Sequence, residues 1–412
     1  MANTLNFGNG KWGVQDGLAL AYNDENNNFK PLPFDFTRDS IGTYVDRDGL
    51  IKTASNNVPR VDFLDNADGA LLLEPARTNL IQYSEAFDNV YWTKSDATVE
   101  SGQVSPTGNT SAFKIVEGTG VGTYHQIYAG NVYTPVVNNY YTFSFFAKPA
   151  ERNVINGVLQ TYNLINVKFD LITKTATVIS GLNASGTIKE YSNGWYKCTV
   201  SGQSSQALGA YANIQLNNGS STIYNGDGSS GAYIYGAQVE QGSYATSYIP
   251  TNGSTVERVA EVSSQTPTTG IIGQTEGVMF LDFNIDNISS QTQNPVLIYL
   301  KNSSGITSYL QIAANGVFVA VHINSGTSID LTKNGLTDGR HKAAFAYKDN
   351  DFAFYVDGVL AGSNTSFTVA SSQTEIGLQY TNAVYTGKQL INDVKLYNTR
   401  LTNAELATLT TT

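Results

Sequence analysis

Short runs in which apolar and polar residues alternate follow one another along most of the chain, and loops rich in Gly, Asn and Ser separate them. Alternation with a period of two indicates a half-buried β-strand, and regularly spaced short strands with turn signals are typical of β-sandwiches and jelly rolls. We therefore predict an all-β protein with two tandem antiparallel β-sandwiches of the jelly-roll type, preceded by an extended, turn-rich N-terminal segment. The clearest runs are residues 140–147, 166–172, 175–179, 194–201, 210–216 and 232–239.

The same pattern divides the chain into five parts. The N-terminal part is polar, and Pro31 and Pro33 impose extended backbone near its end. Because such a segment cannot bury much surface alone, we expect its deletion to leave both sandwiches folded. The predicted parts are an attachment or oligomerisation segment (1–36), an extended entry segment packed on the first sandwich (37–75), the first sandwich (76–252), a linker (253–274) and the second sandwich (275–412).

Local turn signals are clearest in the C-terminal part. The run Phe352–Leu360 contains an Asp-Gly pair and predicts a hairpin, with Lys342–Tyr347 as the partner of its first strand. The spacing of Thr402 and Glu405 fits a capping box and predicts one short helical turn.

Composition and charge mainly exclude some kinds of partner, location and site. A formal net charge of -10 without any Lys/Arg run argues against a nucleic-acid partner. No apolar stretch approaches the roughly 20 residues that span a bilayer, so we expect no membrane insertion. The N-terminus lacks the charged and apolar regions of a secretory signal. The single cysteine, Cys198, cannot form an internal disulfide or a thiolate zinc site, and we interpret it as a buried structural thiol.

Two stretches of the C-terminal part carry a family resemblance. Residues 339–347 (GRHKAAFAY) with 354–360 (FYVDGVL), and the closing run 391–406 (INDVKLYNTRLTNAEL), resemble the paired motifs of concanavalin A-like, laminin-G-like lectin domains. Arg340 replaces an aromatic residue of that pattern. The resemblance implies two packed antiparallel sheets, with Asp357 and Gly358 as structural motif residues of the hairpin. Many members bind glycans, often with calcium, so calcium is a candidate cofactor, although the sequence assigns no ligands to it.

A second resemblance covers residues 36–258. The ordered motifs are similar to a module of tailed-bacteriophage virion proteins, which usually pairs an arginine-rich entry segment with a carbohydrate-binding-module-like sandwich. Residues 5–12 and 21–23 further resemble tail or fibre proteins of phages that infect Bacteroidetes, including crAss-like phages. The motifs are 36–38 (FTR), 42–46 (GTYVD), 48–51 (DGLI), 59–62 (PRVD), 73–80 (LEPARTNL), 84–87 (SEAF), 92–94 (WTK) and 236–251 (GAQVEQGSYATSYIPT).

Several motif residues have side chains that suit a structural role. The planar guanidinium group of an arginine can bind a carboxylate with two hydrogen bonds. The motif arginines are therefore expected to pin the extended segment to the sandwich. The two tryptophans at motif positions are expected to fill cores. These structural residues are Arg38, Arg60, Arg77, Arg258, Trp92 and Trp195.

A glycan site needs aromatic rings beside amide groups on a sheet face. Strand 210–216 alternates so that Ala212, Ile214 and Leu216 can face the core. The opposite face then carries Tyr211, Asn213 and Gln215, to which run 158–162 could add Gln160 and Tyr162. The alternatives are a plain exposed sheet face or a contact between subunits.

Catalytic and metal-binding patterns are weak. The three histidines are scattered, and nucleophile motifs are absent from the sequence. Glycan hydrolysis would need paired carboxylates, for which Asp170, Glu190, Glu240 and Asp393 are the candidates. For Glu240 and Asp393 we favour hydrogen bonds or ion pairs, and we read the oxygen-rich turns around Asp46 and Asp349 as ordinary Asx turns rather than calcium sites.

The sequence therefore predicts a non-enzymatic phage virion surface protein, of tail-fibre or capsid-fibre type, that recognises host surface glycans. A purely structural virion protein is the alternative, and a glycan depolymerase is a lesser one. Expected partners are other virion proteins, bound through the N-terminal segment, and a host glycan. We expect a homo-oligomer, with a trimer as the family-based expectation, located on the virion surface and made in the host cytoplasm.

Overall fold

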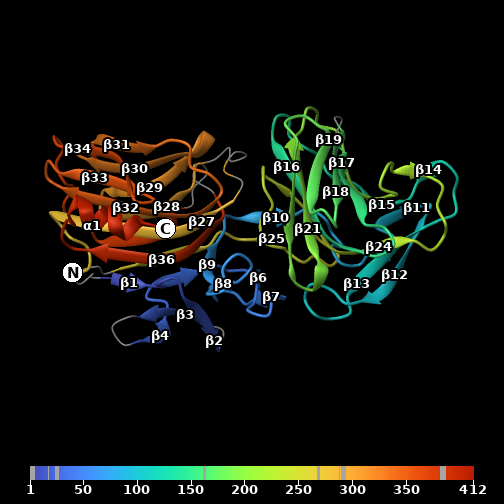
Figure 1. The fold of residues 1–412 in the computed structure, drawn as a ribbon, viewed down its shortest axis with the longest axis horizontal. Helices are drawn as coiled ribbons and strands as arrows, with labels where there is room; N and C mark the ends of the chain where they lie inside the picture. Colours follow the sequence, from blue (N-terminus) through green and yellow to red (C-terminus); the bar gives the residue numbers. More distant parts are fainter. Residues whose placement is uncertain are drawn as a thin grey trace. The chain divides into compact units, whose positions relative to one another are not determined.

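The chain folds into two compact units, and both are built of antiparallel strands (Figure 1). The predicted all-β class is confirmed. Unit 1 comprises Met1–Arg47, Thr53–Ala76 and Val259–Thr412, and unit 2 comprises Asp48–Lys52 and Arg77–Arg258. The computed structural model describes residues 5–16, 18–23, 27–160, 164–266, 270–286, 288, 294–380 and 387–412.

Unit 1 is a sandwich whose two sheets share one hydrophobic core, with Leu281 and Phe345 from one sheet and Leu300 and Leu378 from the other. The eight-stranded sheet has the order β34 (Val359–Asn364), β33 (Phe352–Val356), β32 (Gly339–Lys348), β27 (Glu276–Ile285), β36 (Gln389–Tyr397), β9 (Ala70–Leu73) and β8 (Arg60–Asp62), with β1 (Leu5–Phe7) also paired to β36. The seven-stranded sheet has the order β31 (Thr327–Lys333), β30 (Val317–Asn324), β29 (Gly305–Ala313), β28 (Val296–Asn302), β35 (Glu375–Tyr380), β26 (Val262–Gln265) and β5 (Asp35–Thr37).

The N-terminal residues belong to unit 1, so the predicted boundary after residue 36 is wrong. Strand β1 pairs with β36, and the side chains of Phe7 and Trp12 are buried in the core of the unit. The indole Nε1 of Trp12 donates a hydrogen bond to the carbonyl oxygen of Asn392 at 3.0 Å. Because Trp12 is fully buried, removing this segment would open the core, contrary to the expected tolerance of its deletion. A small sheet follows, formed by β2 (Trp12–Gln15), β3 (Leu18–Asn23) and β4 (Asn28–Pro31).

Most of the entry segment also belongs to unit 1, which corrects its predicted packing on the first sandwich for all but Asp48–Lys52, the part that belongs to unit 2. Val61 of β8 pairs with Leu71 of β9, and Leu71 pairs in turn with Ile391 of β36. The apolar run 71–73 is therefore buried by strands more than 300 positions away in sequence. The predicted linker is partly strand as well, because β25 (Val256–Arg258) lies in unit 2 and β26 in unit 1.

Unit 2 is a second sandwich, made of two six-stranded sheets around one core. The β22 sheet has the order β11 (Trp92–Ser95), β15 (Gln126–Tyr133), β22 (Ala210–Asn217), β17 (Val154–Gln160), β18 (Leu164–Asp170) and β19 (Thr175–Ser180). The β24 sheet has the order β12 (Ala97–Gln103), β13 (Ala112–Glu117), β24 (Gly231–Gln241), β16 (Tyr140–Pro149), β21 (Tyr196–Gln203) and β20 (Ser185–Glu190). Two-stranded pairs in unit 2 are β10 (Arg77–Asn79) with β25, and β14 (Thr123–Tyr124) with β23 (Ile223–Tyr224). A further two-stranded pair joins β6 (Gly42–Val45), which belongs to unit 1, to β7 (Ile51–Ala54).

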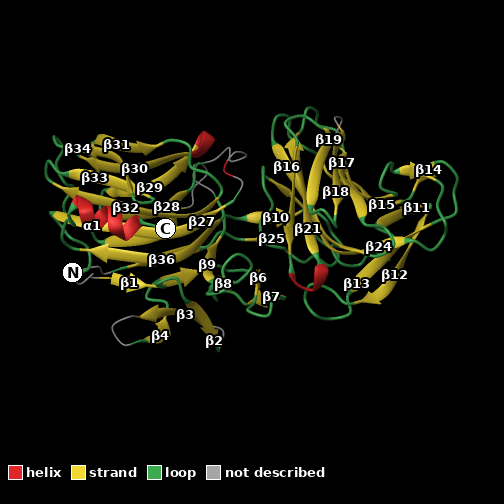
Figure 2. Cartoon of the chain, in the orientation of Figure 1, coloured by secondary structure: helices red, strands yellow, loops and turns green. Residues whose placement is uncertain are grey.

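The predicted C-terminal turns are present. Asp357 and Gly358 have φ angles of 50° and 79° and join β33 to β34, while β32 pairs with β33 as predicted. Thr402 and Glu405 form the capping box of α1 (Asn403–Thr410), an eight-residue helix that is longer than the single turn predicted (Figure 2). Short 3₁₀ turns lie at Ser192–Gly194 and at Ala314–Gly316. No helix in the described ranges is long and apolar enough to cross a membrane.

Candidate functional site

Three of the five predicted glycan-binding residues lie together on β22. Ala212, Ile214 and Leu216 face the core of unit 2, so the alternate residues Tyr211, Asn213 and Gln215 lie on the opposite face of the β22 sheet. Gln160 pairs in register with Tyr211, on the neighbouring strand β17. Tyr162 lies outside the described residues.

Neighbouring strands extend this face with residues that the sequence analysis did not single out. In the antiparallel register, Tyr128 of β15 lies opposite Asn213, and Gln126 lies opposite Gln215. The sequence shows the alternation within each run, but it does not show the register that brings the runs together. We call the combined surface the amide face, formed by Gln126, Tyr128, Asn156, Asn166, Tyr211, Asn213, Gln215 and Asn217.

Two tyrosines provide the aromatic part of the amide face. The ring centroids of Tyr128 and Tyr211 are 6.3 Å apart, with an angle of 51° between the ring planes. The Tyr211 ring lies close over β15 at Gly130, where a Cβ atom would approach Tyr211 Cε1 to 3.0 Å. Glycine at this position therefore leaves room for the ring. Two such rings offer an apolar surface with polar hydroxyl groups at its edge.

Most of the amides bind one another. Gln215 Nε2 donates to Gln126 Oε1 at 2.8 Å. Asn217 Nδ2 donates to Asn156 Oδ1 at 3.0 Å, and Asn156 Nδ2 donates onward to an oxygen of Asn166 at 2.8 Å. These bonds fix the orientation of the amide planes on both sides of Asn213.

Asn213 differs from its neighbours because its amide oxygen has no hydrogen-bond partner in the described part of the chain. The residue is only 7% exposed and lies in register between Tyr128 and Val158. Leaving a buried polar group unpaired costs about 1–3 kcal/mol, so such groups in folded proteins call for an explanation. A ligand hydroxyl that donates to this oxygen would satisfy it.

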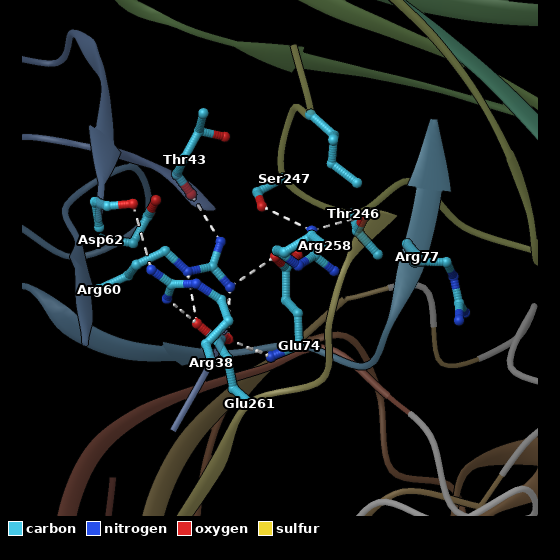
Figure 3. Close-up of polar contacts among 12 residues, drawn as sticks. Arg38, Thr43, Arg60, Asp62, Glu74, Arg77, Thr246, Ser247, Arg258 and Glu261 are labelled. Carbon is cyan, nitrogen blue, oxygen red and sulfur yellow. Dashed lines mark hydrogen bonds and ion pairs between the residues drawn. The ribbon is translucent and has the colours of Figure 1, made fainter. Parts of the chain in front are cut away.

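Arg38 and Arg60 meet at a single carboxylate in unit 1 (Figure 3). Arg38 Nη1 donates to Glu261 Oε1 at 2.7 Å, and Arg60 binds both oxygens of Glu261 at 2.8 and 2.5 Å. Arg60 also pairs with Glu74 at 3.0 Å. Burial opposes the charge of Arg60, but Glu261 and Glu74 outweigh it and raise the pKa of the guanidinium. The acidic partners were not singled out in the sequence, because nothing local links residue 261 to residues 38 and 60.

The other two motif arginines lie in unit 2, on the paired strands β10 and β25. Arg258 Nη1 donates to Thr246 Oγ1 at 3.3 Å and to Ser247 Oγ at 3.1 Å (Figure 3). Arg77 Nε lies 3.8 Å from Glu240 Oε2. Among the motif aromatics, Trp92 and Trp195 are both buried, and Trp92 Nε1 donates to the carbonyl oxygen of Tyr83 at 2.8 Å.

Each carboxylate weighed for hydrolysis has structural partners. Glu240 accepts hydrogen bonds from the backbone N–H and hydroxyl of Thr246. Asp393 pairs with Lys395 at 3.0 Å, and burial raises the pKa of Asp393 to about 6. Asp170 accepts backbone bonds in a turn, and Glu190 pairs with Lys174. Among the residues that the structure describes, no three His, Cys, Asp or Glu side chains are grouped to hold a metal ion, so no calcium ligands are assigned.

Comparisons with known proteins add little to this geometry. No family model matches the sequence, and no curated protein matches it. Solved structures with local similarity include the binding domain of botulinum neurotoxin DC in complex with rat synaptotagmin II (11% identity, TM-score 0.32, 36% of this chain and 39% of that chain) and the Ruminococcus gnavus IT-sialidase CBM40 bound to α2,3 sialyllactose (14%, 0.27, 34% and 84%). The chain thus spans less than half of the neurotoxin chains. At this level of similarity, these structures carry no argument about function.

Proposed function

We propose that this chain is a non-enzymatic glycan-binding protein and that the amide face of unit 2 is its binding site. The observation that carries the proposal is the buried, unpaired amide oxygen of Asn213 beside the rings of Tyr128 and Tyr211. A sugar ring presents apolar C–H groups and hydroxyl groups together. The first can pack on the tyrosines, and a hydroxyl can donate to Asn213.

The amide pairs around Asn213 support this proposal because they are held in place before any ligand arrives. Gln215 is fixed by Gln126, and Asn217 is fixed by Asn156. Amides already oriented by their neighbours lose little conformational freedom when a sugar hydroxyl binds, which favours affinity. The site would therefore recognise hydroxyl geometry without rearrangement of its strands.

We place this function on the surface of a tailed-phage virion, in a tail or capsid fibre. The support is the ordered series of sequence motifs from residue 36 to residue 251, together with the lectin-like motifs of the C-terminal part. The proposed partner is a host surface glycan, and the proposed assembly is a homotrimer. Sedimentation of the purified chain would test the trimer directly.

A binding screen tests the glycan function. We expect saturable binding of the full chain to at least one bacterial surface polysaccharide, with no new reducing ends in the same wells. Tyr211→Ala should weaken that binding by tenfold or more, on the order of the contribution of an aromatic contact and its neighbours. Tyr124→Ala is the matched control, because Tyr124 is an exposed tyrosine of unit 2 on β14. Equal losses in both variants, or no glycan bound at all, would overturn the proposal and favour a purely structural role.

A further inference from the structure

A pocket of about 470 Å³ lies in unit 2 between the loop after β10 and the edge of the β24 sheet. Glu85 and Asp88 contribute from the loop, and Ser101 contributes from β12. At the β12 wall, the pairing with β13 shifts register between Glu100 and Gln103. The remaining lining residues are Ala86, Gly102, Thr110, Ser111, Phe113, Pro250, Thr251 and Asn252.

The carboxylate of Glu85 is oriented by two buried phenols. Tyr235 and Tyr248 both donate their hydroxyl hydrogens to Glu85 Oε1, at 2.9 and 3.0 Å. Burial and the negative charge of Glu85 raise the pKa of both tyrosines, so both remain protonated donors. Within the described ranges, no hydrogen bond reaches Glu85 Oε2. The second oxygen is therefore available to a ligand.

Hydrogen bonds between two loops make the pocket frame rigid. The backbone N–H of Thr251 donates to Ser84 Oγ at 2.8 Å, and Ser84 Oγ lies 2.7 Å from the hydroxyl of Tyr248. Tyr83 and Asn252 form an isolated β-bridge next to these bonds. The loop that carries Glu85 is thus fixed to the loop that carries Thr251, which favours a preformed site.

The lining chemistry defines the ligand. The pocket has two carboxylates and four hydroxyl groups but no Lys, Arg or His in its lining. Lys94, on β11, donates to the backbone carbonyl oxygens of Asp88 and Asn89 at 3.0 and 2.8 Å. We propose that this pocket is a second binding site, which takes a primary ammonium group carried on a hydroxyl-rich molecule, such as an amino sugar with a free amine. The ammonium would donate to Glu85 Oε2, and the Ser and Thr hydroxyls would bind the hydroxyls of the ligand.

Calorimetry with defined oligosaccharides tests this site. The probes, in mildly acidic buffer, are a tetramer of glucosamine, whose free amines are then protonated, and the same tetramer fully N-acetylated, which carries no free amine. We expect the full chain to bind the free-amine tetramer at least about tenfold more tightly than the acetylated one, since a charge-assisted hydrogen bond is lost on acetylation. Glu85→Gln should reduce the affinity for the free-amine tetramer by a similar factor.

A matched control separates the pocket from the overall negative charge of the protein. Glu190→Gln removes one exposed carboxylate of unit 2 that pairs with Lys174 outside the pocket, and it should leave the affinity unchanged. Equal weakening by Glu190→Gln and Glu85→Gln, equal binding of the two tetramers, or no binding by the unmodified chain would each overturn the proposal. Because Tyr211→Ala acts at the amide face, retained binding of the free-amine tetramer by that variant would keep this site distinct from the proposed glycan function.

Discussion

The surroundings of Glu261 in unit 1 and of Asn213 in unit 2 are both buried and polar, but they differ in whether the side-chain oxygens have hydrogen-bond partners. Both oxygens of Glu261 are bound, by the guanidinium groups of Arg38 and Arg60 and by the backbone N–H of Glu74. Asn213 is surrounded by paired amides, but its own oxygen has no partner in the described part of the chain. Similar burial therefore accompanies opposite states of hydrogen bonding.

We use this difference to distinguish groups that hold the fold from groups that we propose for ligand binding. A buried charge without partners costs several kcal/mol, so the network at Glu261 persists only because every member is satisfied. An unpaired neutral amide costs less, and a protein can tolerate one where binding repays the cost. By this criterion the motif arginines Arg38 and Arg60 are structural, and Asn213 is the residue around which we propose a binding site.

The largest expected effect follows from removing the shared charge at Glu261. Glu261→Gln keeps the shape of the side chain but removes the negative charge that Arg38 and Arg60 share. We expect a loss of about 3–5 kcal/mol in the free energy of unfolding of unit 1. Urea unfolding followed by hydrogen exchange of peptides from β27 and β36 would measure it.

The control for this variant is Glu276→Gln, also in unit 1. Glu276 pairs with Lys348 at 3.2 Å where both side chains are partly exposed, so the loss should stay below about 1 kcal/mol. Peptides from β22 should be unaffected by either variant. If Glu261→Gln were no more destabilising than Glu276→Gln, the complete network would not be what holds unit 1 together.

His322 is another buried group with hydrogen-bond partners at both ring nitrogens, and its burial predicts that the stability of unit 1 depends on pH. His322 is fully buried; its Nδ1 lies 2.7 Å from Ser308 Oγ, and its Nε2 accepts the N–H of Ala370 at 2.9 Å. Burial lowers the pKa of His322 from 6.5 to about 4, although Asp349 opposes the shift. The unfolded chain then binds more protons between these values, so this residue's stabilisation is present above pH 6.5 and is lost as the pH falls toward 4, by up to about 3 kcal/mol.

An NMR titration of the three imidazoles isolates this effect. One histidine should remain neutral until about pH 4. Direct titration is needed because Asp393, in the same unit, changes the stability with pH in the opposite direction. Its pKa is raised to about 6 by burial, so its contribution is present below the unfolded value near 3.8 and is lost as the pH rises through 6. Three histidines that all titrate near 6.5 would contradict the assignment of a neutral, fully bonded His322.

The sequence was sufficient for features that depend on neighbouring residues. The period-two runs predicted strands on β16, β22 and β24, and the Asp357-Gly358 pair predicted the hairpin turn. Domain boundaries were missed because they depend on pairing between distant strands. Nothing local shows that Leu71 pairs with Ile391, or that Trp12 packs in the core of unit 1.

The same limit applies to the candidate site. Alternation placed Tyr211, Asn213 and Gln215 on one face, because the side-chain period of a strand is local. The ring of Tyr128 and the missing partner of Asn213 depend on the register between β15 and β22, which composition does not encode. The Glu85 pocket was missed for a similar reason, since its walls come from four separate stretches of chain.

The contribution of hydrogen-bond pairing to stability can be tested within the amide face itself. Asn156 is as buried as Asn213 but uses both ends of its amide, accepting from Asn217 and donating to Asn166. Asn156→Val should leave these two partners unpaired and reduce the stability of unit 2 by about 1–3 kcal/mol. Thermal unfolding of the variant, with peptides from β17 followed by hydrogen exchange, would measure the loss. A neutral outcome would mean that the amide bonds on this face contribute little to the fold.

The same substitution at Asn213, one strand away, should act in the opposite direction. Asn213→Val removes a buried oxygen that has no partner in the part of the chain the structure describes, and valine suits a strand, so unit 2 should become more stable by about 0.5–1 kcal/mol. Glycan binding should fall at the same time, because the acceptor for a sugar hydroxyl is lost. Unfolding and glycan binding measured on one preparation would test both effects. A destabilised Asn213→Val would mean that the oxygen is already satisfied in the free protein, and a stabilised variant with unchanged binding would place the sugar elsewhere.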